Sequence, residues 1–411
     1  MPSEVAEKQQ VSTVAAPWPT MALSEAIDIN PKRPLPKVGN VPFLDMASLP
    51  LHGAPVTVTD KRPVSAGGAR FQAGDTLFAR ITPCAENGKL GFVSALEGGA
   101  TAQGSTEFIV MGARDGITLP EYVRWLSGWR HVRDHAIGLM EGTSGRQRIP
   151  AWAFDEIDVP VPPLDEQRRI AEVLRSVDEA IAANDAALAG VRAAKQGTME
   201  ASLSDGYPEV RLETLLADTR YPMRSGPFGS ALLKSELQPQ GIPFLGIDNV
   251  HVERFVPVYR RFVSEEKYKE LARYTVFPGD VMVTIMGTVG RCCVVPQRVG
   301  TAISSKHVWT ISIDQDRYSS ALLAWQINHS PSVLEQLLGS AQGGIMSAIS
   351  SGTLRDLRLP LPSPEQVREI DDLLCAFNAQ IAVMEAEQRA VQNLKTALMS
   401  DLLSGRVRVP A

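Results

Sequence analysis

Hydrophobic residues recur at helical spacing in two stretches of the chain, which begin near Asp165 and near Glu365. In both stretches the apolar positions alternate between steps of four and three residues, as in the seam of a coiled coil. In the first stretch Asn184 fills the one seam position without an apolar residue. The pattern predicts two long helices with the seam residues Ile170, Leu174, Val177, Ile181, Leu188 and Val191 in the first and Ile370, Leu374, Phe377, Ile381, Met384 and Val391 in the second.

The two predicted helices are copies of one another. Identical residues keep a single ungapped register, as in the pairs Ile170/Ile370 and Lys195/Lys395. A proline-rich segment precedes each helix and disfavours helix before its start, and Gly206 or Gly405 follows, where a left-handed cap is easy. A helix of this length extends roughly 55 to 60 Å, more than a globular core needs. We therefore expect the copies to pair with each other, antiparallel.

The segments upstream of the two helices also repeat each other. The predicted strand VPFLDM from Val41 matches IPFLGI from Ile242, and the predicted turn at Gly74-Asp75 matches that at Gly279-Asp280. The loops between the predicted strands differ in length and sequence. Two copies of one module with diverged loops suit a bipartite target with two different specificities, and DNA is the commonest such target.

Each module is predicted to close with a helix and a Gly/Ser-rich loop. These helices cover 120–137 and 321–337, and the loops are GLMEGTSGRQRIP from Gly138 and GSAQGGIMSAIS from Gly339. A short helix is expected over 23–29. The resulting domain boundaries are 1–17 for a disordered tail, 18–162 for the first module, 163–206 for the first helix, 207–362 for the second module, 363–405 for the second helix and 406–411 for a tail.

The net charge of −5 is carried entirely by the two helical segments. Residues 1–162 carry 15 basic and 17 acidic side chains, 207–362 carry 16 and 14, and the helical segments together carry 10 and 15. The two modules therefore sum to zero. DNA binding needs a local basic face rather than a basic total, so composition neither favours nor excludes it.

Composition limits several other classes of function. The 411 residues are 44% hydrophobic and 21% charged, which is typical of a globular chain with two or more cores. We see no signal peptide and no apolar run near the roughly 20 residues that cross a bilayer, so a cytoplasmic location is expected. The four cysteines form no CxxC pair and no metal-ligand spacing with the six histidines, which favours free thiols over a metal site.

The order of elements and several motifs resemble the specificity subunit of type I restriction-modification systems. The motifs are FQAGDTLFARITPCAENGK from Phe71, GPFGSALLK from Gly226, FPGDVMVTIMGTVG from Phe277 and, above all, PPLDEQRRIAEVL from Pro162. The resemblance covers nearly all of the chain from Trp18 onward. In the second copy the Glu365-Gln366 pair stands one residue early, which weakens that copy of the signature but keeps the seam.

This resemblance implies an α+β fold with two target recognition domains joined by an antiparallel pair of long helices. Each domain would read one half of a split DNA site, and the helix pair would dock two methyltransferase subunits that carry S-adenosylmethionine and methylate adenine N6. Two motor-nuclease subunits using ATP and Mg²⁺ complete such complexes. The chain itself would have no cofactor, no metal and no catalysis. Independently, the sequence shows no GxxxxGK[ST] loop, no HExxH and no Asn/Asp-Pro-Pro-Tyr/Phe methylation motif.

Candidate DNA contacts are Arg and Lys for phosphates and guanine, and Asn and Gln for adenine. The most attractive run is 146–148, because small residues before it would let the backbone approach phosphate. A loop that merely caps the neighbouring strand is the alternative. The candidates are Arg80, Asn87, Lys89, Arg146, Gln147 and Arg148 in the first module and Arg224, Ser225, Lys234, Arg291, Lys306 and His307 in the second.

Three functions stay open at this point. The first is a non-catalytic DNA-recognition subunit. The second is a nuclease or methyltransferase whose active site uses motifs that we do not recognise, and the third is a protein-binding scaffold without a nucleic-acid role. Turnover by the chain alone would identify an enzyme, and salt-dependent retention of DNA would exclude the scaffold.

Overall fold

The computed structural model describes residues 17–97, 101–143, 145–204, 206–339 and 349–410. These residues form two compact units: unit 1 comprises the chain up to Asp185 and from Glu387 onward, and unit 2 comprises Ala186–Ala386. The division passes through both long helices. The expected disordered tail, apart from Pro17, and most of the second Gly/Ser-rich loop lie outside the described residues.

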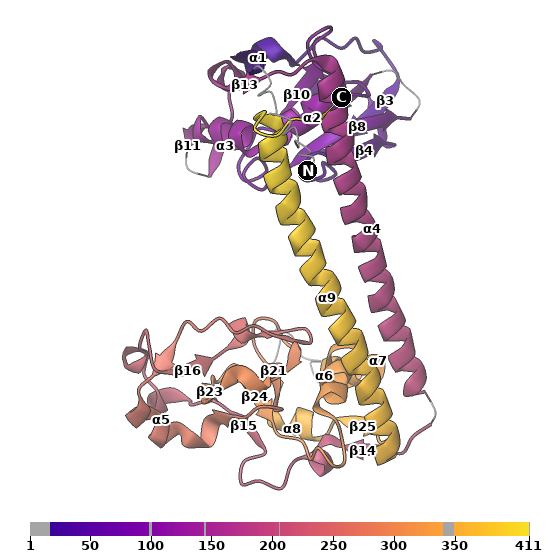
Figure 1. Cartoon of the computed structure of the whole chain (residues 1–411). Coiled ribbons are helices and arrows are strands. Elements are labelled where there is room, and N and C mark those ends of the chain that lie inside the picture. The colour runs from indigo at the N-terminus through magenta and orange to yellow at the C-terminus, as the bar shows by residue number, and fades with distance from the viewer. Residues whose placement is uncertain (1–16, 98–100, 144, 205, 340–348, 411) are drawn as a thin grey trace, which may run out of the picture. The chain divides into compact units, whose positions relative to one another are not determined.

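Unit 1 is built on two small sheets (Figure 1). In the second sheet β3 and β9 run parallel, whereas the other pairs are antiparallel. Helix α2 (Pro120–Gly128) packs on the first sheet, and Trp125 and Leu126 join Phe78 and Ile109 in one apolar core. The first sheet has the order β2 (Ile27–Ile29), β10 (Phe108–Ala113), β7 (Thr76–Ala79), β8 (Leu90–Leu96) and β4 (Ala54–Val58), and the second has β5 (Lys61–Pro63), β3 (Asn40–Leu44), β9 (Ala102–Gly104) and β6 (Ala69–Phe71).

Unit 2 repeats the second sheet with its parallel pair, which is here β16 with β23, and four strands of the first sheet, but among the described residues it has no counterpart of β4, which runs parallel to β8 in unit 1. The duplication predicted from the sequence is thus visible in the strand order. The first sheet has the order β15 (Met223–Ser225), β24 (Val308–Ile311), β21 (Val281–Thr284) and β22 (Cys292–Val294), and the second has β19 (Phe262–Val263), β16 (Ile242–Leu245), β23 (Ala302–Ser304) and β20 (Thr275–Val276).

Shorter elements complete the two units. A two-stranded ribbon precedes each long helix, and it pairs the start of each module with its end. These elements are β1 (Thr20–Ala22) with β13 (Asp158–Pro160), β14 (Glu209–Arg211) with β25 (Arg358–Pro360), β17 (Val250–His251) with β18 (Arg254–Phe255), α1 (Leu23–Ala26), α3 (Arg130–Gly138), α5 (Glu265–Leu271), α6 (Ser320–His329), α7 (Pro331–Gly339) and α8 (Ser351–Arg355).

Four local predictions were wrong. The helix expected over 23–29 ends at Ala26, because Ile27–Ile29 forms β2 and pairs with β10. The helix expected over 120–137 is broken at Trp129, whose extended ψ of 134° separates α2 from α3. The helix expected over 321–337 is broken in the same way at Ser330, whose extended ψ of 120° separates α6 from α7. The first Gly/Ser-rich loop contains a hairpin of β11 (Glu141–Thr143) and β12 (Arg146–Arg148), which the sequence pattern did not indicate.

The two long helices are α4 (Leu164–Ser202) and α9 (Pro364–Leu403), and both are followed by glycines with positive φ, as expected. Within unit 1, Asn184 Nδ2 donates to Gln388 Oε1 at 2.6 Å. Within unit 2, Arg192 Nη2 donates to Glu385 Oε1 at 2.6 Å. Residues that lie later in α4 contact residues that lie earlier in α9. The two helices are therefore antiparallel in each unit.

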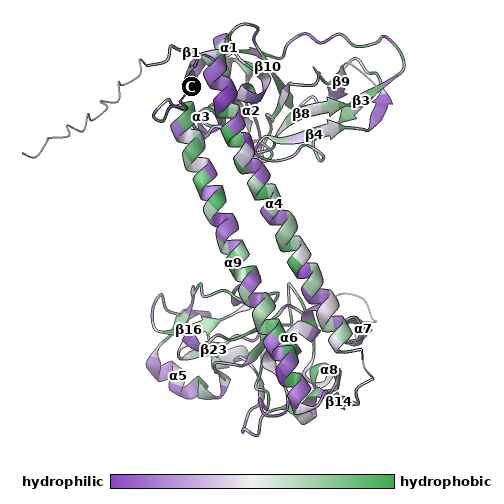
Figure 2. Cartoon of the chain, turned by 45° about the vertical axis from the view of Figure 1, so that its right-hand side comes forward, coloured by the Kyte–Doolittle hydropathy of each residue, from purple (hydrophilic) through white to green (hydrophobic). Residues whose placement is uncertain are grey.

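Burial along the predicted seam is uneven. Ile170 and Leu174 belong to the core of unit 1, and Ile370 and Leu374 to the core of unit 2, so the first turns of each helix pack on the adjacent module. Leu188 is also buried. The remaining seam residues are half-buried, because a pair of helices leaves one flank of its seam open; they are Val177, Ile181, Val191, Phe377, Ile381, Met384 and Val391. Hydrophobic and hydrophilic residues alternate along both helices (Figure 2).

Residues near both ends of the described chain meet in unit 1. The Trp18 indole donates to Glu166 Oε2 at 3.1 Å, and the Arg408 guanidinium lies 4.6 Å from the centre of the Trp18 ring. Arg408 also donates to both oxygens of Glu166, at 2.7 and 2.6 Å. The predicted tail of 406–411 therefore includes residues that pack on unit 1. Among the described residues, no helix is both long and apolar enough to cross a membrane.

Candidate nucleic-acid interface

A basic pocket lies in unit 1 beside β6, β10 and the end of β7. Its cavity has a volume of about 620 Å³, and four cationic residues line it: Lys32, Arg33, Arg70 and Arg80. No acidic residue is among the described residues that line this cavity. Such a concentration of one sign of charge attracts anions, and the phosphate groups of nucleic acids are among the anions that lysine and arginine bind.

Arg80 is the predicted candidate that lies in this pocket. It follows β7, and its backbone is held on both sides, because its N–H donates to Glu107 O at 3.0 Å and its carbonyl accepts from Ile149 N at 2.8 Å. Among the described residues, its buried Nε has no hydrogen-bond partner. A buried donor without a partner is costly, so this position is suited to an incoming acceptor.

Arg33 is attached to the framework beside the same pocket. Its Nη2 and Nε donate to the Asp75 carboxylate at 2.6 and 3.0 Å. In unit 2, Arg224 pairs in the same way with Asp280 and also donates to Thr275 O at 2.6 Å. Arg224 is 6% exposed, so this predicted DNA contact serves the framework instead. Its neighbour Ser225 is 7% exposed and donates to a backbone carbonyl.

The run at 146–148 forms β12, and its last residue is bound within the fold. Arg148 Nε and Nη2 donate to Glu107 at 2.6 to 3.0 Å, and the hydrogen bond from Arg148 holds the pKa of Glu107 below its usual range. The Gln147 carbonyl accepts from Thr82 N at 3.0 Å. The hairpin thus caps the end of β7, which was the alternative interpretation of this run. Arg146 is exposed and stays a candidate.

The remaining candidates of unit 1 differ in their surroundings. The Lys89 ammonium donates to three carbonyls, those of Met46, Ala47 and Leu49, at 2.6 to 3.1 Å. These bonds close the loop after β3, so we no longer count Lys89 among the DNA contacts. Asn87 is exposed in the turn before β8.

In unit 2, Lys306 and His307 occupy the turn that carries Thr106 and Glu107 in unit 1. The equivalence is visible in the backbone, because Ile285 N donates to His307 O at 3.0 Å as Arg80 N donates to Glu107 O. Lys306 is exposed. Burial, with Lys306 and Arg261 nearby, lowers the pKa of His307. Equivalent turns thus present an anion in one unit and a cation in the other.

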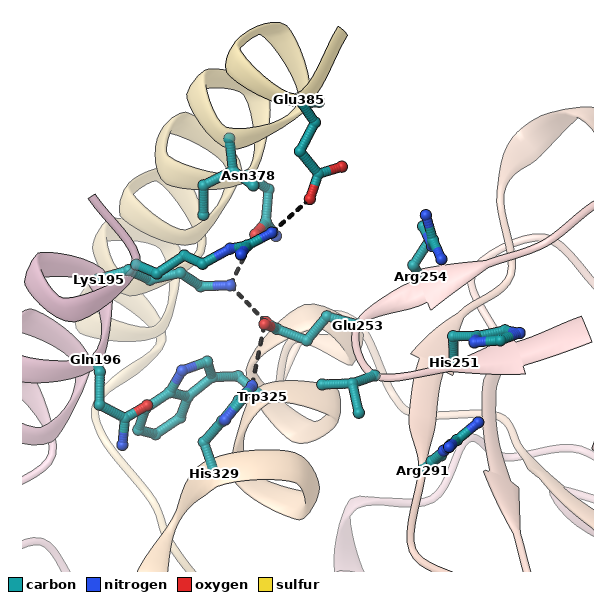
Figure 3. A pocket seen from close by; sticks show the side chains of 14 residues that line it. Lys195, Gln196, His251, Glu253, Arg254, Arg291, Trp325, His329, Asn378 and Glu385 are labelled. Atoms are coloured by element: carbon teal, nitrogen blue, oxygen red, sulfur yellow. Dashed lines mark hydrogen bonds and ion pairs between the residues drawn. The ribbon is translucent and has the colours of Figure 1, made fainter. Parts of the chain in front are cut away.

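Arg291 lies at a second pocket, of about 690 Å³, where the helix pair meets the module of unit 2 (Figure 3). Lys195 Nζ donates to Glu253 Oε1 at 2.5 Å and to Asn378 Oδ1 at 2.7 Å. Burial raises the pKa of Glu253, but hydrogen bonds from His329 and Lys195 outweigh it and keep that pKa low. This network attaches both helices to the hairpin of β17 and β18.

Unit 1 has a related network in the equivalent place. Lys395 Nζ lies 2.5 Å from Asp178 Oδ1, and Arg124 Nη2 donates to Asp178 Oδ2 at 2.6 Å. In unit 1 the carboxylate is that of Asp178, which belongs to the helix. In unit 2 the equivalent helix position is Asn378, and the carboxylate comes from Glu253 in the hairpin. Lys195 and Lys395 thus fix each module to the helix pair by different carboxylates.

Of the predicted candidates, Arg80 lies in the basic pocket of unit 1, Lys306 and His307 share one turn of unit 2, and Arg291 lies in the separate pocket at the helix pair. Lys234 is exposed on a short turn. The sequence missed Lys32, Arg33 and Arg70. Only the pairing of β6 with β9 and the path of the loop after β2 bring them to Arg80, and no short motif carries that information.

Comparisons with known proteins agree with this organisation. Residues 18–191 match the model of the type I restriction modification DNA specificity domain. The chain is 22% identical over 368 residues to the provisionally named type I restriction enzyme MjaX specificity subunit of Methanocaldococcus jannaschii, which covers 83% of this chain and 80% of that protein. It is 28% identical over 172 residues to the EcoAI specificity subunit of Escherichia coli, covering 41% and 29% of the two chains.

Solved structures share the fold. A chain from a type I restriction-modification system studied for complex assembly and conformational transition has a TM-score of 0.60 at 18% identity, over 96% of this chain and 100% of that one. The S subunit from M. genitalium has a TM-score of 0.54 at 12% identity, over 94% and 96%. The predicted α+β class and the resemblance stated from the sequence are confirmed, and the relatives are named as specificity subunits of type I restriction enzymes.

Proposed function

We propose that this chain, which is similar to the specificity subunits of type I restriction-modification systems, recognises a bipartite DNA site for such a complex. The observation that carries the proposal is the unit 1 pocket lined by Lys32, Arg33, Arg70 and Arg80 without an acidic neighbour among its described lining residues. Arg and Lys on a fixed framework position a protein on the phosphates of a duplex.

The difference between the two units supports two different half-sites. The strands that the two units share follow the same order, yet the equivalent turns carry Thr106-Glu107 in unit 1 and Lys306-His307 in unit 2. Glu107 is held by Arg148 within unit 1, whereas Lys306 of unit 2 is exposed and can donate to guanine or to phosphate. Similar frameworks whose equivalent turns differ in this way suit the recognition of unlike sequences.

We also propose that adenine-N6 methyltransferase subunits dock on the helix pair. The helical segments hold the whole net charge of −5, and acidic residues such as Glu179 and Asp372 are exposed on them. This surface suits a basic partner. S-adenosylmethionine would belong to those subunits and ATP with Mg²⁺ to restriction subunits. A location in the cytoplasm stays a prediction from the sequence.

Fluorescence anisotropy with double-stranded DNA tests the proposal on the full-length chain. We expect DNA binding that weakens steeply with salt. For Arg70→Ala and Arg80→Ala we expect the slope of log binding constant against log salt concentration to decrease by about one unit per lost contact. Arg130→Ala is the matched control, because Arg130 is exposed on α3 and does not line the pocket. Equal losses in all three variants would remove the pocket from the interface, and no retention by any form of the chain would defeat the proposal.

A second assay separates recognition from catalysis. The purified chain is incubated with DNA, Mg²⁺ and S-adenosylmethionine, and both strand breaks and methylated bases are measured. We expect no turnover by the chain alone and adenine methylation when a methyltransferase subunit from its host is added. Turnover by the isolated chain would show that it is an enzyme.

A further inference from the structure

The equivalent strands β3 and β16 carry a phenylalanine at the same position, Phe43 in unit 1 and Phe244 in unit 2. An arginine lies against each ring. The Arg62 guanidinium carbon is 4.0 Å from the centre of the Phe43 ring, and that of Arg261 is 5.8 Å from the centre of the Phe244 ring. Both distances are within the range of a cation–π contact.

A carboxylate holds the edge of each guanidinium. Arg62 Nη2 lies 3.4 Å from Asp45 Oδ2, and Ser48 N in turn donates to Asp45 Oδ1 at 2.9 Å. Arg261 Nη2 lies 2.7 Å from Asp248 Oδ1. The face of each guanidinium and one of its edges are therefore fixed by different groups.

The carboxylate and the arginine around each phenylalanine do not occupy equivalent positions in the two modules. Asp45 aligns with Gly246, whereas the acid of unit 2 stands two residues later in the chain. The arginines differ as well: Phe43 N donates to Asp60 O and Phe244 N donates to Arg261 O, so Arg62 lies two residues beyond the position that is equivalent to Arg261. The same arrangement is thus assembled from unequal positions around the one phenylalanine that the modules share.

Both arginines reach solvent beside the candidate DNA contacts. Their side chains are 52% and 35% exposed. In unit 1, Val41 pairs with Arg62 while Phe43, Gln103 and Arg70 align across three strands, so strand register places Arg62 and Arg70 on one face of the sheet. In unit 2, Arg261 lies near His307, the residue whose turn carries Lys306.

We propose that Arg62 and Arg261 each read a guanine in the major groove, one in each half-site. A lysine binds a phosphate as a point charge, whereas a guanidinium held in a fixed plane presents two donors that match the O6 and N7 atoms of guanine at once. Stacking on phenylalanine and the carboxylate supply that fixed plane. Exposed ion pairs contribute little to folding, so stability does not account for the arrangement. This inference rests on the proposed DNA-recognition function.

The test is selection of a randomised duplex library by the full-length chain with the subunits that co-purify from its host, followed by sequencing. We expect a two-part motif with a G·C pair in each part. Arg62→Ala lowers the preference for guanine at one position of one part by about 5- to 150-fold, and Arg261→Ala does so only in the other part. Arg62→Lys keeps the charge but not the paired donors, so we expect it to relax the same position while the salt dependence of binding stays as in the wild type.

Two further variants sharpen the result. Gly246→Ala keeps every charge, but a Cβ at this position would collide with Arg261 Nη2. We therefore expect Gly246→Ala to change the specificity in the same way as Arg261→Ala. Arg130→Ala is the control and keeps both parts. A uniform loss of affinity with both parts intact, or a wild-type motif without a G·C pair in either part, overturns the guanine assignment but leaves DNA recognition standing. Absence of any selected motif in the wild type overturns both.

Discussion

At the scale of single residues, the two units use different charged groups to attach each module to the helix pair. Lys395 and the buried Arg124 share Asp178 in unit 1, whereas Lys195 in unit 2 bonds the neutral Asn378 and takes its carboxylate from Glu253. The side chain of Arg124 is 7% exposed, and burial lowers its pKa. Asp178 therefore supplies the carboxylate for the buried Arg124, whereas Asn378 only accepts a hydrogen bond from the buried Lys195, whose carboxylate partner is Glu253.

This difference predicts unequal effects of mutations at equivalent positions. We expect Asp178→Asn to lower the free energy of unfolding by about 3 kcal/mol, because it leaves a buried guanidinium without its carboxylate. Asn378→Ala removes one hydrogen bond and should cost about 1 kcal/mol. Urea unfolding followed by tryptophan fluorescence measures both. Equal losses would show that the Arg124 pair is not a major contributor.

Arg408 supplies a prediction with a definite pH dependence. The hydrogen bond from Arg408, with that from Trp18, holds the pKa of Glu166 below its usual range despite partial burial. A lowered folded-state pKa contributes stability above the unfolded pKa of about 4.3, and this stability is lost as the pH falls through the folded value. We expect Arg408→Ala to cost about 1–3 kcal/mol at pH 7 and progressively less below pH 4.

Thermal unfolding of the wild type and Arg408→Ala between pH 3 and pH 8 measures this effect. Arg406→Ala is the control, because Arg406 is mostly exposed and pairs with the partly exposed Asp401. A difference between wild type and Arg408→Ala that is independent of pH would show that the variant acts through packing on Trp18 rather than through Glu166.

At the scale of elements, the sequence predicted the long helices to within a few residues, because their heptad pattern, proline-rich entries and glycine ends all agree. The short strand β2 was missed. Its three residues follow a helical turn without a turn residue between them, and only the pairing with β10 selects the extended form. The burial of the candidate Arg224 was missed for a related reason, since burial by a distant strand is not visible in local sequence.

The polar residues of the seam give the element-scale prediction. Gln388 is 7% exposed, accepts from Asn184 and donates to Asp185 Oδ1 at 2.7 Å. We expect Gln388→Leu to cost about 1–2 kcal/mol, because it removes both bonds, and Asn184→Leu with Gln388→Leu to recover much of that loss. Met384→Leu, an apolar exchange at another seam position, is the control. A double-mutant cycle by urea unfolding measures the coupling, and zero coupling would contradict a role in setting register.

At the scale of the whole molecule, the internal repeat is what the sequence established most firmly, and the strand orders of the two units agree with it. What the sequence could not supply is the set of side chains at the basic pocket. Lys32, Arg70 and Arg80 are far apart along the chain and meet only through strand pairing. Loops that differ between the modules offer no internal copy with which to check them.

The last prediction concerns the length of the helix pair and the gap between the two half-sites. Seven residues added to α4 after Asp185 and to α9 before Glu387 keep the heptad and lengthen both helices by about 10.5 Å. Because one base pair rises about 3.4 Å, we expect the preferred gap between half-sites to grow by about three base pairs. Methylation of a library of spacings by the assembled complex measures the gap. A heptad exchanged without a change in length is the control, and an unchanged gap would show that the helices do not set it.

The contact of Arg408 with Trp18 and Glu166 brings residues near both chain ends together in unit 1. A short peptide could therefore join the ends while the backbone is opened between α4 and β14, which would exchange the order of the two halves and keep all of these contacts. We expect such a permuted chain to fold, because each of these contacts would be kept.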